Sequence, residues 1–255
     1  MINRKKKKNG LTVVILAAGL GTRLGALTKD RPKALTPVYG KPILSYALSL
    51  ARLLNPKKIV VVGGYLFPQL EAAVHALDPK AVVVENKNFQ GTQRMASLLV
   101  AKDEILGDLA VFDGDYIYHR SVADKIQAHL KEQMKIFCTE EEHPFVQLDM
   151  MVHTDENNRL IDMSKDLKEF KYYFNSFFYC PARLVDVYLK TAEQTIRRLG
   201  IHKTHLEDAI VECAKNGTEV LAVPLGHPRW IEVDNQQELA VAEKMIAEDP
   251  RGYSF

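Results

Sequence analysis

The sequence contains few cysteines, and those it has form no recognisable pattern. Among 255 residues there are three, Cys138, Cys180 and Cys213, which are far apart and odd in number. That spacing favours neither a disulfide framework nor a zinc site. We therefore expect three reduced residues in the core of a cytoplasmic protein.

Long apolar runs are missing as well. No apolar segment approaches the roughly 18 residues that a membrane-spanning helix needs, and the N-terminus lacks the apolar region of a signal peptide. These absences predict a protein without a membrane span, in agreement with a cytoplasmic location.

The chain also has almost no excess of charge. Its 34 Lys and Arg residues against 32 Asp and Glu residues give a net charge of +2, whereas nucleic-acid proteins normally carry a larger, clustered basic excess. We expect no nucleic-acid partner. Residues 1–10 contain a basic run at residues 4–8 and are predicted to be a disordered extension, with a membrane-surface or nuclear-import role as the minor alternative.

What the sequence does have is enough apolar content, 47%, for a large buried core. Short, continuously apolar segments alternate with helical patterns, as in a sheet whose strands are parallel and buried on both faces. The predicted strands are Val13–Ala17, Ile59–Val62, Val82–Glu85 and Leu109–Asp113. The intervening helices are predicted to begin at Pro42, Pro68 and Met95, and another covers Val122–Leu130.

The pattern changes after residue 135, where short strands follow one another without helices between them. We expect strands at Ile136–Cys138, Val146–His153, Leu160–Met163 and Tyr172–Tyr179, forming an antiparallel extension of the sheet. Two helices, Val185–Arg198 and His205–Asn216, two strands, Val220–Pro224 and Trp230–Val233, and a helix at Asn235–Ala247 complete the chain. The fold class is thus α/β, a Rossmann-like, mixed but mainly parallel sheet flanked by helices, in one domain over residues 11–255.

A glycine loop follows the first predicted strand. Gly19 and Gly21 have no Cβ, which lets the backbone turn sharply and bring its N–H groups against an anion. Arg23 and Lys33 then supply positive charge. The glycine spacing is one residue too wide for the dinucleotide fingerprint G-x-G-x-x-G, and the Gly-Lys-Ser/Thr of a P-loop is absent.

The stretch resembles the signature of the nucleoside-triphosphate transferases, the sugar-phosphate and choline-phosphate nucleotidyltransferases. That signature is L-A-A-G-x-G-T-R followed by P-K, present here as Leu16, Ala17, Ala18, Gly19, Gly21, Thr22, Arg23, Pro32 and Lys33. The resemblance extends to about residue 246 and implies a nucleotidyltransferase fold. It implies that Leu16 to Thr22 bind the nucleotide, that Arg23 contacts the triphosphate, and that Lys33 lies near the α-phosphate.

The resemblance also assigns roles to residues farther along the chain. Gln93 and Ser97, at the start of the helix after residue 92, would read the base and ribose, although Thr92 could equally be an ordinary helix N-cap. The compact segment there looks closer to the choline-phosphate cytidylyltransferase branch. Lys165 would grip the acceptor phosphate, but the family's Glu-Lys-Pro is altered here and its later glycine is Ser176. Two other lysines, Lys168 and Lys171, therefore remain alternatives.

A magnesium site is implied by two acidic residues at strand ends. Asp115 follows the strand ending at Asp113, and Asp234 follows the last predicted strand. Mg²⁺ needs only one or two carboxylates besides phosphates and waters. Glu232 is the alternative to Asp234, which could instead be an N-cap, and Asp113 is either a second ligand or part of the turn.

The implied reaction is transfer of a nucleotide from a nucleoside triphosphate to a phosphorylated acceptor, with release of pyrophosphate. A phosphate nucleophile is already ionised, so no general base is required. We expect CTP and an acceptor such as phosphocholine, because a quaternary ammonium binds over aromatic rings. The candidate aromatics are Tyr172, Tyr173, Phe174, Phe177, Phe178, Tyr179 and Trp230, which could equally pack in the core.

Two alternatives remain open from the sequence. A sugar-1-phosphate nucleotidylyltransferase using UTP, dTTP or GTP could bind sugar hydroxyls through Asn175, Glu207 and Asp208. An inactive nucleotide-sensing domain would retain the fold without turnover, but it would not need all of the charged residues that are present.

Overall fold

The computed structural model describes residues 10–140, 150–226 and 229–253. The predicted basic extension lies outside these ranges apart from Gly10, and so does the first part of the strand predicted at residues 146–153. Most other predicted elements are present, with ends within two or three residues of their expected positions.

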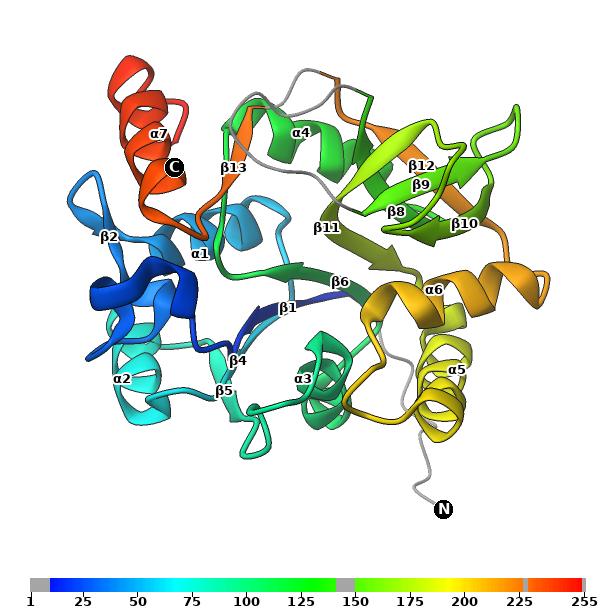
Figure 1. Ribbon diagram of the computed structural model, residues 1–255, viewed down its shortest axis with the longest axis horizontal. Coiled ribbons are helices and arrows are strands. Elements are labelled where there is room, and N and C mark those ends of the chain that lie inside the picture. The colour runs from blue at the N-terminus through cyan, green and yellow to red at the C-terminus, as the bar shows by residue number, and fades with distance from the viewer. Residues whose placement is uncertain (1–9, 141–149, 227–228, 254–255) are drawn as a thin grey trace.

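Four parallel strands form the centre of the molecule (Figure 1). They are β1 (Leu11–Ala17), β4 (Lys58–Gly63), β5 (Val82–Glu85) and β6 (Asp108–Asp113), in the spatial order β5-β4-β1-β6. In β1, Ile15 lies beside Val61 of β4 and Phe112 of β6. The prediction of a mainly parallel sheet is therefore confirmed.

Helices cover both faces of this sheet. One apolar cluster joins Val13 and Ile15 of β1 to α1 (Ile43–Leu53), α2 (Phe67–Leu77) and α4 (Arg120–His129). The other joins Val14 and Leu16 to α3 (Arg94–Val100), α5 (Ala182–Leu199) and α6 (Leu206–Lys215). Because alternate strand residues point to opposite faces, β1 has to be apolar on both.

Within the described ranges, no helix is long and apolar enough to cross a membrane.

The extension beyond β6 is antiparallel except at its last strand. β11 (Tyr172–Cys180) pairs antiparallel with β6, β8 (Met134–Thr139) and β9 (Met151–Thr154), and β10 (Leu160–Ser164) pairs antiparallel with β9. β12 (Val220–Pro224) instead joins β8 in parallel. Two helices, α5 and α6, precede β12 and give the chain the long crossover that parallel pairing requires.

Short elements of distant sequence origin form a third apolar cluster, which the sequence did not predict. β7 (Tyr116–Tyr118) pairs antiparallel with β13 (Trp230–Glu232), and α7 (Gln236–Glu248) packs against β13 and β2 (Pro37–Val38). β3 (Lys41–Pro42) pairs with β2, and the 3₁₀ segments are η1 (Thr22–Thr28), η2 (Lys33–Leu35) and η3 (Lys102–Glu104). Figure 1 shows the C-terminal α7 beside this N-terminal part of the chain. This packing brings residues near 234 next to the glycine loop.

The end of β4 fits tightly under the loop that follows β1. A Cβ atom at Gly64 would lie 2.6 Å from Cβ of Phe89 and 2.8 Å from the carbonyl oxygen of Ala18. Only glycine leaves room for this approach.

We expect Gly64→Ala to lower the free energy of unfolding by about 1 to 3 kcal/mol, because a backbone oxygen cannot move aside as a flexible side chain could. Each kcal/mol corresponds to roughly 2 to 4 °C in Tm for a chain of this size. Gly19→Ala is the matched control, since a Cβ there would meet no atom within 4 Å. Equal Tm values for the two variants would contradict this reading of the packing.

Candidate active site

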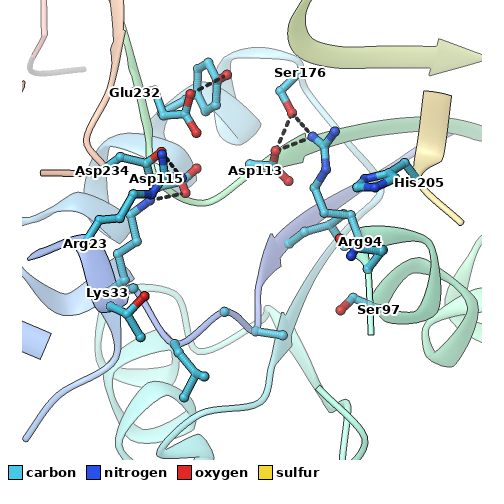
Figure 2. Close-up of a pocket in the computed structure, with 18 of the residues that line it drawn as sticks. Arg23, Lys33, Arg94, Ser97, Asp113, Asp115, Ser176, His205, Glu232 and Asp234 are labelled. Atoms are coloured by element: carbon cyan, nitrogen blue, oxygen red, sulfur yellow. Dashed lines mark hydrogen bonds and ion pairs between the residues drawn. The ribbon is translucent and has the colours of Figure 1, made fainter. Parts of the chain in front are cut away.

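A large cleft lies at the carboxyl ends of β1 and β6, where open α/β sheets bind their ligands. Its volume is about 950 Å³. Figure 2 shows two groups of charged side chains facing each other across it, one around Lys33 and one around Arg94. Most of the predicted site residues line the cleft: Leu16, Ala18, Gly19, Gly21, Thr22, Arg23, Lys33, Gln93, Ser97, Asp115, Lys165 and Asp234.

Ala17, also a predicted nucleotide-binding residue, does not line the cleft. Its side chain lies beneath the site, since a Cβ at Gly114 would stand 3.0 Å from that of Ala17. The structure thus brings together every predicted site residue except this one.

The glycine loop closes directly over Lys33. Gly21 has a left-handed backbone with φ of 65°, and a Cβ there would lie 2.7 Å from Cβ of Lys33. The Thr28 hydroxyl donates a hydrogen bond of 2.9 Å to the Gly21 carbonyl and holds the turn. Glycine is required at residue 21 for two reasons, its backbone conformation and its contact with the lysine.

Lys33 lies between two carboxylates. Its Nζ donates to Asp115 at 2.6 Å and also to Asp234, and its side chain is only 11% exposed. Burial alone lowers the pKa of Lys33, but the negative charges of Asp115 and Asp234 outweigh it and raise the pKa well above its usual range. Arg23 forms an ion pair with Asp234 while its side chain stays 71% exposed. Lys33 is thus a fixed cation, and Arg23 is one that a ligand can reach.

Asp115, Glu232 and Asp234 form a cluster of three carboxylates. One oxygen from each lies within 4.8 Å of the others. Oδ1 of Asp115 is buried without a hydrogen-bond partner among the described residues. Burial, and then the charges of Asp115 and Asp234, raise the pKa of Glu232, which accepts a hydrogen bond from the Tyr116 hydroxyl at 3.1 Å. An unpaired buried oxygen among converging carboxylates is the donor set that a hard divalent cation such as Mg²⁺ prefers.

Asp234 is not the N-cap of the last helix, which was the alternative to a metal role. Asn235 takes that position, and its side chain accepts hydrogen bonds from the backbone N–H groups of Gln237 and Glu238. The Glu238 carboxylate accepts from the N–H of Asp234 at 2.6 Å. This capping box fixes the backbone of Asp234 and leaves its carboxylate facing Lys33.

Arg94 forms the second charged group in the cleft. Its Nη1 donates to Asp113 and to the Ser176 hydroxyl, each at 2.5 Å, and its Nη2 pairs with Glu207. Within the described residues Asp113 does not belong to the three-carboxylate cluster, so the interpretation of Asp113 as a metal ligand finds no support. Burial raises the pKa of Asp113 to about 6, although Arg94 opposes this shift.

The start of α3 carries the residues expected to read the nucleoside. Gln93, rather than Thr92, is at the N-cap position, and its Nε2 donates to the His202 carbonyl at 3.2 Å. The Thr92 hydroxyl donates to the Asn88 carbonyl at 2.8 Å, so the interpretation of Thr92 as N-cap is wrong. Asn86 donates to the Ser97 hydroxyl at 3.0 Å. Amide and hydroxyl groups are thus held in place at this wall of the cleft.

Only some of the lysines and polar residues expected at the acceptor end line the cleft. Lys165 lines the cleft, whereas Lys168 does not and Lys171 donates to Asn158 at 2.9 Å. Of the residues considered for a sugar, Glu207 lines the cleft. Asp208 caps α6 by accepting from the His205 N–H at 2.7 Å, and Asn175 is fully buried.

The expected aromatic cage is not formed. Most of the seven candidates are buried in the core: Tyr172, Phe174, Phe177, Phe178, Tyr179 and Trp230. Phe177, for example, stacks on Phe112 with ring centroids 5.3 Å apart. Of the seven, only Phe174 borders the cleft. The interpretation of this aromatic stripe as a cation-binding cage is therefore wrong, because alternate strand residues pack into the two apolar clusters.

Sequence reasoning missed the network around Arg94. The sequence assigns no role to Arg94, and it suggests Glu207 only as a possible sugar ligand. The signal that could have found them is the pairing of a cation at the start of one helix with an acid at the start of another. Arg94 and Glu207 are 113 positions apart, and nothing in that spacing shows that their side chains meet.

The chain is similar in sequence to known nucleotidyltransferases. The choline-phosphate cytidylyltransferase of Haemophilus influenzae is 31% identical over 121 residues, 48% of this chain and 51% of that protein. The UTP–glucose-1-phosphate uridylyltransferase of Haloferax volcanii is 32% identical over 126 residues, 48% of this chain and 51% of that protein. The chain thus matches about half the length of each of these relatives.

A solved structure and a family match extend the likeness beyond these partial alignments. The inositol-1-phosphate CTP transferase from T. maritima has a TM-score of 0.79 at 18% identity, covering 94% of this chain and 96% of that one, so it shares the fold. Residues 13–199 match the MobA-like NTP transferase domain. The chain therefore belongs to the family of MobA-like NTP transferases, which are nucleotidyltransferases.

Proposed function

We propose that this chain transfers CMP from CTP to a small phosphorylated acceptor such as phosphocholine and releases pyrophosphate. One observation carries the nucleotidyl transfer: Arg23, Lys33 and three carboxylates converge beside the glycine loop at one end of the cleft. The choice of acceptor rests on the similarity to a choline-phosphate cytidylyltransferase. Cations and backbone N–H groups suit a triphosphate, and clustered carboxylates suit the divalent cation that accompanies it.

In the proposed reaction, an oxygen of the acceptor phosphate forms a bond to the α-phosphorus of CTP. The bond from that phosphorus to the oxygen bridging the α- and β-phosphates breaks, and pyrophosphate leaves with that electron pair. Lys33 stabilises negative charge at the α-phosphate, Arg23 contacts the β- and γ-phosphates, and Lys165 holds the acceptor phosphate. Holding anions that repel each other in line supplies most of the catalysis.

Asp115 and Asp234 would hold Mg²⁺, with Glu232 as the third carboxylate of the cluster. The metal would neutralise negative charge on the phosphates as pyrophosphate leaves. In the structure, Lys33 pairs with both Asp115 and Asp234, and Arg23 pairs with Asp234, so both cations are already next to the position that the phosphates would occupy.

Two observations support CTP over other triphosphates. The segment from Thr92 to Ser97 is compact, and two proteins that this chain resembles are a cytidylyltransferase and a CTP transferase by name.

A specific observation favours the second candidate, a UTP-dependent sugar-1-phosphate transferase. Glu207 lines the cleft, where its carboxylate could accept hydrogen bonds from sugar hydroxyls. The third candidate is an inactive nucleotide-sensing domain.

We expect Lys33→Ala to reduce kcat/KM by roughly 100- to 1,000-fold, because one preorganised cation contributes about 2.7 to 4 kcal/mol to the transition state. The variant should also have a lower Tm without metal, since two buried carboxylates lose their partner, and Mg²⁺ should restore part of it. Lys190→Ala, on the exposed side of α5, is the control. Pyrophosphate release at the wild-type rate would remove Lys33 from the mechanism.

The second prediction concerns the metal ligands. Asp234→Asn should raise the Mg²⁺ concentration needed for half-maximal activity, because a carboxylate's charge is lost with little change of shape. Asp124→Asn, an exposed substitution on α4, serves as the control in the same Mg²⁺ titration. If Glu232→Gln raised the requirement while Asp234→Asn left it unchanged, Glu232 would replace Asp234 in the assignment.

The substrate prediction is tested by measuring pyrophosphate release for each combination of four triphosphates and several acceptors with Mg²⁺. We expect the highest kcat/KM for CTP with a small phosphomonoester of the phosphocholine kind. A preference for UTP, dTTP or GTP with a sugar-1-phosphate would favour the second candidate. Nucleotide binding without pyrophosphate release from any combination would favour the sensing domain.

A further inference from the structure

Ser176 has an unusual backbone for its place in the fold. Its φ is +65°, in the left-handed region that residues with a Cβ rarely adopt. It lies inside β11, where the pairing with β8 shifts register between Phe174 and Phe178, and it is only 4% exposed. Glycine would adopt this backbone without strain. The bulge in β11 therefore does not itself call for a serine.

The Ser176 hydroxyl bonds to two charged groups at once. It donates to the Asp113 carboxylate and accepts from Nη1 of Arg94 at 2.5 Å. Figure 2 shows it above the point where the guanidinium meets Asp113. Hydrogen bonds to charged groups are the stronger ones in proteins. The left-handed serine is thus held by its side chain and completes a triangle with Arg94 and Asp113.

This triangle connects the two halves of the cleft. Asp113 begins the turn that leads to Asp115, and the N–H of Gly114 in that turn donates to the Leu16 carbonyl at 2.8 Å. Arg94 starts α3, at the nucleoside wall, and its other Nη pairs with Glu207 at the start of α6. Fixing the Asp113 carboxylate therefore fixes a guanidinium on one side and the turn carrying Asp115 on the other.

We propose that Ser176 is a positioning residue for nucleotidyl transfer: its hydroxyl locks Arg94 onto Asp113, which holds the guanidinium and the Asp115 turn in their working positions in the cleft. This inference rests on the proposed function. The two groups that it holds lie on the nucleotide side of the cleft, whereas Lys165, proposed to bind the acceptor phosphate, is not among the residues it contacts. Its loss should therefore lower kcat and weaken triphosphate binding, and leave acceptor binding unchanged.

Two substitutions separate the hydroxyl from the backbone. Ser176→Gly removes the hydroxyl and relieves the left-handed strain, whereas Ser176→Ala removes the hydroxyl and keeps the strain. We expect both to lose roughly 10- to 100-fold in kcat/KM for the triphosphate, as for a lost hydrogen bond to a charged group. The KM for the acceptor should stay within about twofold of wild type. The Tm of the glycine variant should exceed that of the alanine variant by roughly 2 to 4 °C.

Glu132→Gly is the matched control. Glu132 also has a left-handed backbone, with φ of +48°, but it is exposed and lies outside the cleft residues. This variant should gain stability and keep the wild-type kcat and both KM values. Wild-type kcat in Ser176→Gly would overturn the proposal. The proposal would also be overturned if the loss of activity in the two Ser176 variants followed the loss in their Tm values. That pattern indicates a purely structural role.

A second measurement does not depend on turnover. In NMR spectra of ¹⁵N-arginine-labelled protein, the Nη–H signals of Arg94 should exchange slowly with solvent in the wild type and in Glu132→Gly, and faster in both Ser176 variants, which keep the pairs with Asp113 and Glu207. Arg94→Lys identifies the signals. Wild-type exchange rates in Ser176→Gly would overturn the proposed locking of Arg94. If the wild type released no pyrophosphate with any substrate pair, the proposed function would fail, and the spectra would still decide whether Ser176 orders Arg94.

Discussion

The structure depends above all on the contact between Lys33 and the carboxylates of Asp115 and Asp234. These three residues come from the segment after the glycine loop, the turn after β6 and the connection before α7. Without a cation between them, the two acids would repel each other inside the protein. The lysine therefore ties the first and last parts of the chain together, and the same charges form the end of the cleft that suits a metal-bound triphosphate.

The two charged groups in the cleft are joined through one short turn. Asp113 and Asp115 are two residues apart, yet Asp113 faces Arg94 and Ser176 whereas Asp115 faces Lys33. The residue between them is Gly114, which fits this tight turn because a Cβ there would stand 3.0 Å from Cβ of Ala17. Burial raises the pKa of Asp113 to about 6, and its bonds to Arg94 and Ser176 favour the ionised form. Asp113 thus holds Arg94 and Ser176 in place, while the carboxylate of Asp115 is available to a cation.

The aromatic residues of β11 show how a correct local pattern can support a wrong functional interpretation. Tyr172 to Tyr179 were correctly predicted to lie in a strand, and a strand in the interior of a sheet has both faces covered by other elements. Phe178 packs against Tyr188 of α5 on one face, and Phe177 packs against Phe112 and Phe137 on the other. An acceptor would meet one of these rings, that of Phe174, with the charged residues around it.

The sequence by itself determined the parallel core, the glycine loop and the candidate residues of the first motif, because these depend on local periodicity and on residues close together in the chain. Only the tertiary structure decided that Glu232 joins both Asp115 and Asp234 while Asp113 turns to Arg94, and that Ser176 adopts a left-handed backbone. The pairing of β12 with β8, the β7–β13 ribbon and the Arg94–Glu207 contact also join segments roughly 80 to 120 positions apart. Such contacts follow from how the elements pack, and periodicity along one chain carries no information about them.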